Sequence, residues 1–133
     1  MSTSKRETAL AFLDAVVESD REKMVAVCRN DFVWTYVPTS MGMKPLAGNA
    51  AFAYLSTVIG ANFKAGSLRY GVLRSLEGVD DVVLELNVKA TALNGKPYDN
   101  FYVMWFEFRD GLISELREHT DTKYVDKVFS FGS

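Results

Sequence analysis

The chain has 133 residues, of which 48% are apolar, and its formal net charge is −2. This length fits one domain spanning residues 1–133, and the apolar content is too high for a disordered chain. Lysine and arginine are scattered without a basic stripe, which argues against a nucleic-acid partner. No window approaches the roughly 20 apolar residues of a membrane span, and no secretion signal is recognisable at the N-terminus. We therefore expect a cytoplasmic protein that binds neither nucleic acid nor membranes.

Apolar residues at helical spacing predict helices in the first half of the chain, and runs of β-branched and aromatic residues predict strands. The strands of the second half are separated by "EGVDD", "LNGK" and "RDGL", which are typical of turns. The predicted helices span residues 2–19, 19–30 and 49–63, and the predicted strands span residues 31–37, 68–76, 82–93, 98–109 and 112–122. Helices followed by a run of antiparallel strands indicate an α+β fold.

Two stretches resemble a known family. "GKPYDNFYVMWFEFRDGLISELREHTD" and "PLAGNAAFAYL" are similar to motifs of the SnoaL-like family within the NTF2-like superfamily, in the same order and spacing. The resemblance implies a cone in which helices pack on a strongly curved, mainly antiparallel mixed sheet that encloses a pocket. It also implies a hydrophobic small-molecule ligand. Relatives include ketosteroid isomerases, limonene-type epoxide hydrolases and polyketide cyclases.

The turns predict which strand residues face each other. Asn94-Gly95 predicts a two-residue hairpin loop, because both residues tolerate a positive φ. Residues that face each other across a pair of strands project to the same side of the sheet. The opposed pairs would then be Asn87 with Tyr102, Glu85 with Met104, and Lys89 with Asn100.

The turn at Arg109-Asp110-Gly111 leaves two alternatives. A two-residue loop would place Val103 opposite Glu118, and a three-residue loop would place Tyr102 opposite Glu118. A shift of one residue turns every side chain to the other face. We favour the three-residue loop, because it places the apolar Met104 opposite Leu116 and agrees with the family, in which the acid at this position lines the cavity.

With this register, one face combines polar and apolar side chains, as the walls of binding pockets do. Its members are Glu85, Asn87, Lys89, Asn100, Tyr102, Met104, Leu116, Glu118 and Thr120. Trp34 and Tyr36 share one side of their strand, and the resemblance places that strand at the cavity. An ordinary strand with one wet face, and ordinary core aromatics, remain the alternative interpretations.

The other face carries Phe101, Val103 and Trp105 beside Arg117, His119 and Asp121. An apolar centre with a charged rim is typical of a subunit interface, so we expect a homodimer through this face. His119 titrates near neutrality and lies beside acids, but strand alternation turns it away from Glu118. With one cysteine, Cys28, and one histidine far apart in sequence, there is no ligand pattern for a metal. We expect neither a metal nor a cofactor.

Glu118 is the candidate catalytic group. In a largely apolar pocket its pKa would rise towards neutrality, which suits a general acid or base. Tyr102 and Asn87 would hydrogen-bond it or donate to a developing oxyanion. The alternative is a structural pairing of Glu118 with Lys89 or Arg117.

The sequence therefore predicts a cofactor-independent enzyme of the SnoaL-like type. It would carry out acid-base chemistry, as an isomerase, cyclase, lyase or hydrolase, on a hydrophobic oxygenated ligand. A non-catalytic binding or protein-interaction module on the same scaffold is the alternative. Epoxide hydrolysis is not expected, because Glu85 and Asn87 stand where those relatives have the arginine and first aspartate of their Asp-Arg-Asp set. The steroid site is not expected either, because the first helix has Phe12 and Leu13 where the isomerases need a tyrosine.

Overall fold

A computed structural model describes residues 3–37 and 42–129. It contains a six-stranded sheet in the order β2-β1-β6-β5-β4-β3. β1 and β6 run parallel, and the other neighbouring pairs run antiparallel. The strands are β1 (Cys28–Tyr36), β2 (Leu46–Ala47), β3 (Arg69–Glu77), β4 (Asp81–Thr91), β5 (Pro97–Arg109) and β6 (Leu112–Thr120). The mixed, mainly antiparallel α+β architecture is confirmed.

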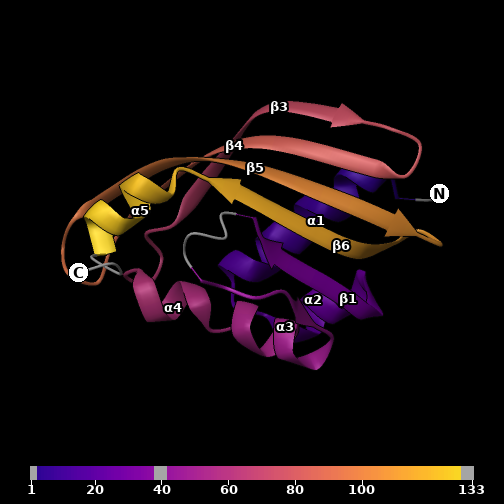
Figure 1. Cartoon of the computed structure of the whole chain (residues 1–133), viewed down its shortest axis with the longest axis horizontal. Helices are drawn as coiled ribbons and strands as arrows, with labels where there is room; N and C mark the ends of the chain where they lie inside the picture. Colours follow the sequence, from indigo (N-terminus) through magenta and orange to yellow (C-terminus); the bar gives the residue numbers. More distant parts are fainter. Residues whose placement is uncertain (1–2, 38–41, 130–133) are drawn as a thin grey trace.

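The helices are α1 (Lys5–Val17), α2 (Arg21–Ala26), α3 (Asn49–Leu55), α4 (Val58–Asn62) and α5 (Thr122–Phe129). α1 packs across β3, β4 and β6, whereas α3 contacts β1 and β2. Figure 1 shows α5 at the end of the sheet where β6 finishes. In the part of the chain that is described, no helix is long and apolar enough to cross a bilayer.

Local signals explain where the helices begin and end. The Ser4 side chain accepts a hydrogen bond from the Glu7 backbone N–H at 3.1 Å, as expected of the cap of α1. The single helix predicted for residues 49–63 is instead two short helices. At the break, the hydroxyls of Ser56 and Thr57 donate to carbonyls of α3, which ends that helix.

An aromatic row joins the helices to the sheet. The Phe12 ring of α1 lies 5.5 Å from Phe32 of β1 and 5.9 Å from Phe106 of β5, centroid to centroid. Phe32 in turn stacks on Phe52 of α3 at 5.5 Å. These rings are buried, and each such contact contributes about 0.5–1.5 kcal/mol beyond the burial of apolar area. The row fixes α1 and α3 on the same side of the sheet.

The predicted β4–β5 hairpin is wrong by one residue. The Ala92 backbone N–H donates to the Lys96 carbonyl at 2.9 Å, so the loop has three residues and ends in Gly95, whose φ is 87°. Asn94 is held in this loop from outside the hairpin, because its side-chain amide donates to the Val128 carbonyl of α5 at 2.9 Å. The longer loop moves every pair along β4 and β5 by one residue.

The β5–β6 turn also differs from the favoured alternative. Arg109 pairs with Leu112, so the loop has two residues, Asp110 and Gly111, and both have positive φ. A bulge follows at once: Phe108 pairs with Ile113, but Glu107 pairs with Glu115. The extra residue between them, Ser114, donates its hydroxyl to the Glu107 carbonyl at 3.1 Å. The bulge shifts the pairing of the rest of β6 by one residue, so Met104, rather than Val103, lies opposite Glu118.

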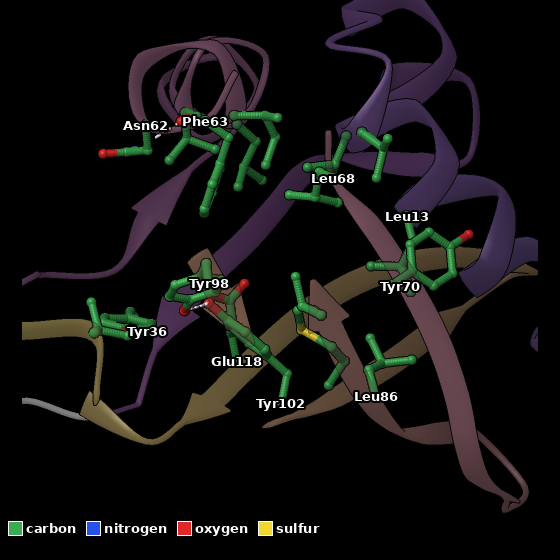
Figure 2. Close-up of a pocket in the computed structure, with 18 of the residues that line it drawn as sticks. Leu13, Tyr36, Asn62, Phe63, Leu68, Tyr70, Leu86, Tyr98, Tyr102 and Glu118 are labelled. Atoms are coloured by element: carbon green, nitrogen blue, oxygen red, sulfur yellow. Dashed lines mark hydrogen bonds between the residues drawn. The ribbon is translucent and has the colours of Figure 1, made fainter. Parts of the chain in front are cut away.

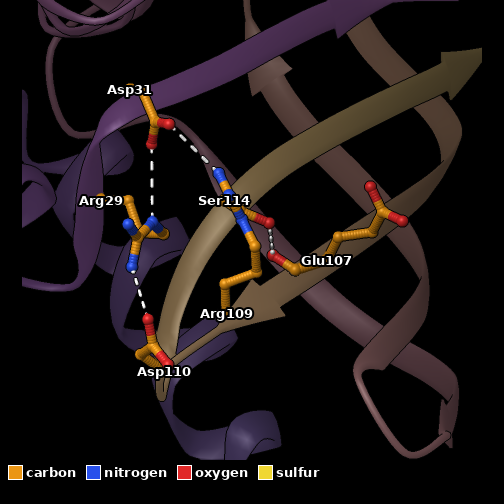
Figure 3. A network of polar contacts seen from close by, with 6 residues as sticks. All are labelled: Arg29, Asp31, Glu107, Arg109, Asp110 and Ser114. Atoms are coloured by element: carbon orange, nitrogen blue, oxygen red, sulfur yellow. Dashed lines mark hydrogen bonds and ion pairs between the residues drawn. The ribbon is translucent and has the colours of Figure 1, made fainter.

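Charged residues gather beside this turn, where β1 begins and β5 ends (Figure 3). Arg29 donates to Asp110 at 2.9 Å and lies 3.5 Å from Asp31, and Arg109 donates to Asp31 at 3.1 Å. These four residues are called the ion-pair cluster below. The cluster connects β1 to the β5–β6 hairpin at the end of the sheet opposite to Glu118.

Candidate functional site

A cavity of about 390 Å³ lies between the helices and the inner face of the sheet. Its volume falls within the range of small-molecule sites. Most of its wall is apolar and comes from α1, α3, α4, β4 and the residue that precedes β3. These residues include Leu13, Val16, Leu55, Val58, Ile59, Leu68, Leu86 and Val88.

Glu118 and three tyrosines lie together at one side of the cavity. Figure 2 shows Tyr36, Tyr98, Tyr102 and Glu118 close to one another, with Leu13, Leu68 and Leu86 on the opposite side. A bound molecule would therefore meet Glu118 and these tyrosines at one end, and mainly apolar side chains together with Tyr70 at the other.

Glu118 projects from β6 into this polar side, next to Met104 on β5. Its carboxylate accepts a hydrogen bond from the Trp34 indole N–H at 3.3 Å. Among the described residues that line the cavity, Glu118 is the only acid, and none is a lysine or arginine. The carboxylate thus faces the cavity without a neighbouring cation.

The surroundings of Glu118 raise its pKa to about 7, because burial disfavours the charged carboxylate. The hydrogen bond from Trp34 opposes this rise but does not cancel it. Part of the side chain remains accessible, and it borders the cavity. Near neutral pH the group is therefore present in both protonated and ionised forms, facing the space where a ligand would lie.

Four tyrosines surround the acid: Tyr36, Tyr54, Tyr98 and Tyr102. Burial raises the pKa of each hydroxyl, and the negative charge of Glu118 raises it further. These phenols therefore stay neutral and can donate hydrogen bonds at physiological pH. Trp34 stacks against Tyr36 and Tyr54, with centroid distances of 6.0 and 5.2 Å, which orders this wall.

Five of the residues predicted from the sequence line the cavity: Trp34, Tyr36, Tyr102, Met104 and Glu118. Three others lie on the inner side of the sheet without lining it. Leu116 is buried, Asn100 is buried and hydrogen-bonded to Tyr98, and Thr120 donates to the Phe101 carbonyl at 2.7 Å.

The predicted positions of Glu85, Asn87 and Lys89 are wrong. The three-residue loop at Gly95 turns them to the outer face, where Asn87 pairs with Phe101 and donates to Asp99 at 2.7 Å. The inward positions of β4 are instead Leu84, Leu86 and Val88, all buried. No polar side chain of β4 therefore faces Glu118, and the arginine and aspartate of an epoxide-hydrolase set have no counterpart on this strand.

Sequence reasoning missed Tyr98, Tyr54, Tyr70 and Asn62, which also line the cavity. Tyr98 could have been found, because it alternates with Asn100 and Tyr102 on one strand and therefore shares their face. Tyr54 lies in α3, in the segment for which the sequence predicted only a helix. Tyr70 lies on β3, which contributed no predicted site residue.

The two other candidate side chains lie away from the cavity lining. His119 lies opposite Val103 on the outer face, and partial burial together with the charge of Arg117 lowers its pKa. Cys28 is buried, and burial raises the pKa of its thiol, which keeps it protonated and unreactive. The described residues contain no cluster of His, Cys, Asp or Glu that could hold a metal ion.

Known structures share this fold over nearly the whole chain. An NTF2-like protein of unknown function from Burkholderia pseudomallei aligns with a TM-score of 0.80 at 18% identity, covering 95% of this chain and 97% of that one. TerC, crystallised with polyporic acid, aligns with a TM-score of 0.80 at 22% identity, covering 97% and 98%. A proposed SnoaL-like polyketide cyclase from Jannaschia sp. CCS1 gives 0.80 at 20% identity, covering 98% and 97%. No curated protein sequence matches significantly.

The sequence itself matches the SnoaL-like domain over residues 9–116. The matched segment contains every element of the fold except α5, the first turn of α1 and the end of β6. It stops two residues before Glu118, so the match supports the scaffold and says nothing of the acid. With the NTF2-like fold and this match together, the chain belongs to the SnoaL-like family.

Proposed function

We propose that this single-domain protein binds a hydrophobic, oxygenated small molecule and moves protons on it with Glu118. One observation carries the proposal: an acid with a pKa of about 7 faces an apolar cavity without a neighbouring cation. A residue whose pKa lies near the working pH can both take and return a proton. The proposed setting is the cytoplasm, and no cofactor is required by this chemistry.

The arrangement suits abstraction of a proton from carbon beside a carbonyl group. The ionised Glu118 would take the proton, the C–H electron pair would form the enolate C=C bond, and negative charge would develop on the ligand oxygen. Neutral tyrosine hydroxyls could donate to that oxygen. The protonated Glu118 would then return the proton to another carbon. Alternatively, the enolate carbon would attack a second carbonyl carbon of the ligand, and Glu118 would return the proton to the alkoxide that forms there. Isomerisation and cyclisation are the two outcomes that need no further reactant.

The family gives coarser support for the same ligand class. TerC was crystallised with polyporic acid, and another relative is described as a polyketide cyclase. Both descriptions concern oxygenated carbon skeletons. The apolar side of the cavity, with Leu13, Leu68 and Leu86, would hold the hydrocarbon part of such a molecule.

The test uses 2-tetralone, a hydrophobic ketone with acidic C–H bonds beside its carbonyl. The wild-type protein should accelerate exchange of these hydrogens for deuterium above the buffer rate, as followed by NMR. Glu118→Gln should lose about 10²–10⁴-fold of this acceleration. Glu115→Gln on the same strand is the matched control and should keep it, because Glu115 pairs with Arg117 rather than lining the cavity.

A ketone that binds without any accelerated exchange would favour the alternative of a non-catalytic binding protein. Equal exchange rates in the wild type and Glu118→Gln would remove Glu118 from the chemistry. A separate carboxyl NMR titration should give Glu118 a pKa well above the ~4.3 of a free side chain.

We also propose that the outer sheet face forms a homodimer. Phe101 is 62% exposed and Trp105 41% exposed, and Val103 lies between them on β5. Charged residues including Glu85 and Arg117 border this apolar strip, as at many interfaces. Sedimentation should give twice the mass of one chain, and Trp105→Glu should give a monomer. A monomeric wild type at micromolar concentration would contradict the proposal.

A further inference from the structure

Strand β5 places three polar side chains at alternate positions of its inner face: Tyr98, Asn100 and Tyr102. Tyr98 is 2% exposed and Asn100 is 3% exposed. A buried polar group costs free energy unless it is hydrogen-bonded. We therefore expect every polar atom of the Asn100 amide to be hydrogen-bonded. Its partners show which of its atoms donate and which accept.

The orientation of the Asn100 amide is fixed by two backbone groups. Its carbonyl oxygen accepts from the Phe101 N–H at 2.8 Å, a group that can only donate. Its nitrogen donates to the Asp121 carbonyl at 3.2 Å, a group that can only accept. Exchanging the amide oxygen and nitrogen would break both bonds. The second amide hydrogen is consequently donated to the Tyr98 hydroxyl at 3.1 Å.

The Tyr98 hydroxyl thus accepts from Asn100 and still has its own hydrogen to donate. The Tyr102 hydroxyl is the one acceptor that the described residues offer it. If Tyr102 donated instead, the hydrogen of Tyr98, which is 2% exposed, would have no partner among the described residues, and an unpaired buried donor is unfavourable. The hydrogen bonds are therefore donated in one order: Asn100 donates to Tyr98, and Tyr98 donates to Tyr102. The hydrogen of Tyr102 is left for a group in the cavity.

We propose that Asn100 and Tyr98 are positioning residues that direct the Tyr102 hydroxyl hydrogen towards a ligand oxygen beside Glu118. The inference rests on the proposed ligand class but not on catalysis. Tyr102 lines the cavity, and Figure 2 shows its ring running from Tyr98 alongside Glu118. The polarised chain makes Tyr102 a stronger donor than an isolated phenol, by about 10–30% per preceding bond.

The experiment measures the donor directly with 2-acetylnaphthalene carrying ¹³C at its carbonyl. Infrared spectroscopy of the bound ketone should show a C=O stretch below its frequency in hexane, because hydrogen bonding weakens that bond. Tyr102→Phe should abolish this shift. Tyr98→Phe should leave it present but reduced by about 10–30%, because Tyr102 keeps its hydroxyl and loses its polarising neighbour.

Tyr98→Phe is the decisive variant, because a phenylalanine keeps the ring contacts with Phe63 and Tyr124 and leaves both backbone bonds of Asn100 intact. Asn100→Leu should give a reduction at least as large, but it also removes those backbone bonds and can unfold the protein. The matched control is Tyr124→Phe. Its hydroxyl accepts from the Asp99 backbone N–H, outside the cavity lining, so the wild-type shift should remain.

Each other result is informative. An unshifted carbonyl in the bound wild type, or an equal shift in Tyr102→Phe, would overturn the inference while leaving the binding function intact. A shift lost in Tyr102→Phe but unchanged in Tyr98→Phe would refute the positioning role of Tyr98 and Asn100. Failure of the ketone to bind the wild type would contradict the proposed ligand class, and the inference with it.

Discussion

The two ends of the sheet shift the pKa of a carboxyl group in opposite directions. At the ion-pair cluster, burial alone would raise the pKa of Asp31, but the hydrogen bond from Arg109 and the charges of Arg109 and Arg29 hold it below its ordinary value. At the cavity, burial acts on Glu118 without a cation, and its pKa rises to about 7. β1 and β5 contribute residues to both ends. Two differences therefore separate these acids: Asp31 is 63% exposed and lies beside two arginines, whereas Glu118 lines the cavity with no cation among the described residues there.

The largest expected effect is on stability as a function of pH. Glu118 has a folded pKa of about 7 against an ordinary value of 4.5. The folded state therefore holds the proton more tightly than the unfolded state. Below pH 4.5 the Glu118 carboxyl group does not reduce the free energy of unfolding. The reduction grows as pH rises from 4.5 to 7, and above pH 7 it reaches up to roughly 3 kcal/mol.

Urea unfolding at pH 5 and pH 8 measures this effect. The free energy of unfolding of Glu118→Gln should exceed that of the wild type at pH 8 and be close to it at pH 5. That of Glu115→Gln should equal the wild-type value at both pH values. Parallel pH profiles for the wild type and Glu118→Gln would contradict the raised pKa.

A cation introduced beside Glu118 should lower the pKa of its carboxyl group, as the arginines do for Asp31. Met104 lies directly opposite Glu118, so Met104→Lys places an ammonium group beside the carboxylate. The pKa of Glu118 should fall by about 1 to 3, as followed by NMR of the labelled carboxyl carbon. Val103→Lys, one residue away on the outer face, is the matched control and should leave the pKa near 7. The reverse result would show that the register of β5 and β6 is wrong.

The smallest effect is expected at the ion-pair cluster. Asp110→Asn removes one charge, while asparagine tolerates the positive φ of 54° at this turn. The free energy of unfolding should decrease by less than about 1 kcal/mol, because the Asp110 side chain is 85% exposed. The decrease should vanish in 1 M salt, which screens exposed charges. A loss of several kcal/mol that persists in salt would mean that the cluster is more than a surface network.

The sequence predicted the strand that carries the acid and the strand that faces it, and it identified Glu118, Tyr102, Trp34 and Tyr36 as neighbours. It failed on Glu85, Asn87 and Lys89, because Asn94-Gly95 is a strong two-residue turn signal taken alone. In the fold, the Asn94 side chain bonds to Val128 of α5, which lies 34 residues away in sequence, and such a contact is invisible to local reasoning. The sequence predicted the correct face for Glu118, although the turn has two residues and not the favoured three. The bulge at Ser114 adds the missing one-residue shift, so Glu118 still faces the cavity.

That bulge decides which face of β6 meets the cavity. If Ser114 paired regularly with Glu107 in place of the bulge, the rest of β6 would shift by one position and Val103 would lie opposite Glu118. Arg117 and His119 would then replace Glu118 at the cavity wall, exchanging an acid for two basic side chains without altering any of the three. One unpaired residue outside the pocket therefore decides whether an acid or two basic side chains face the ligand space.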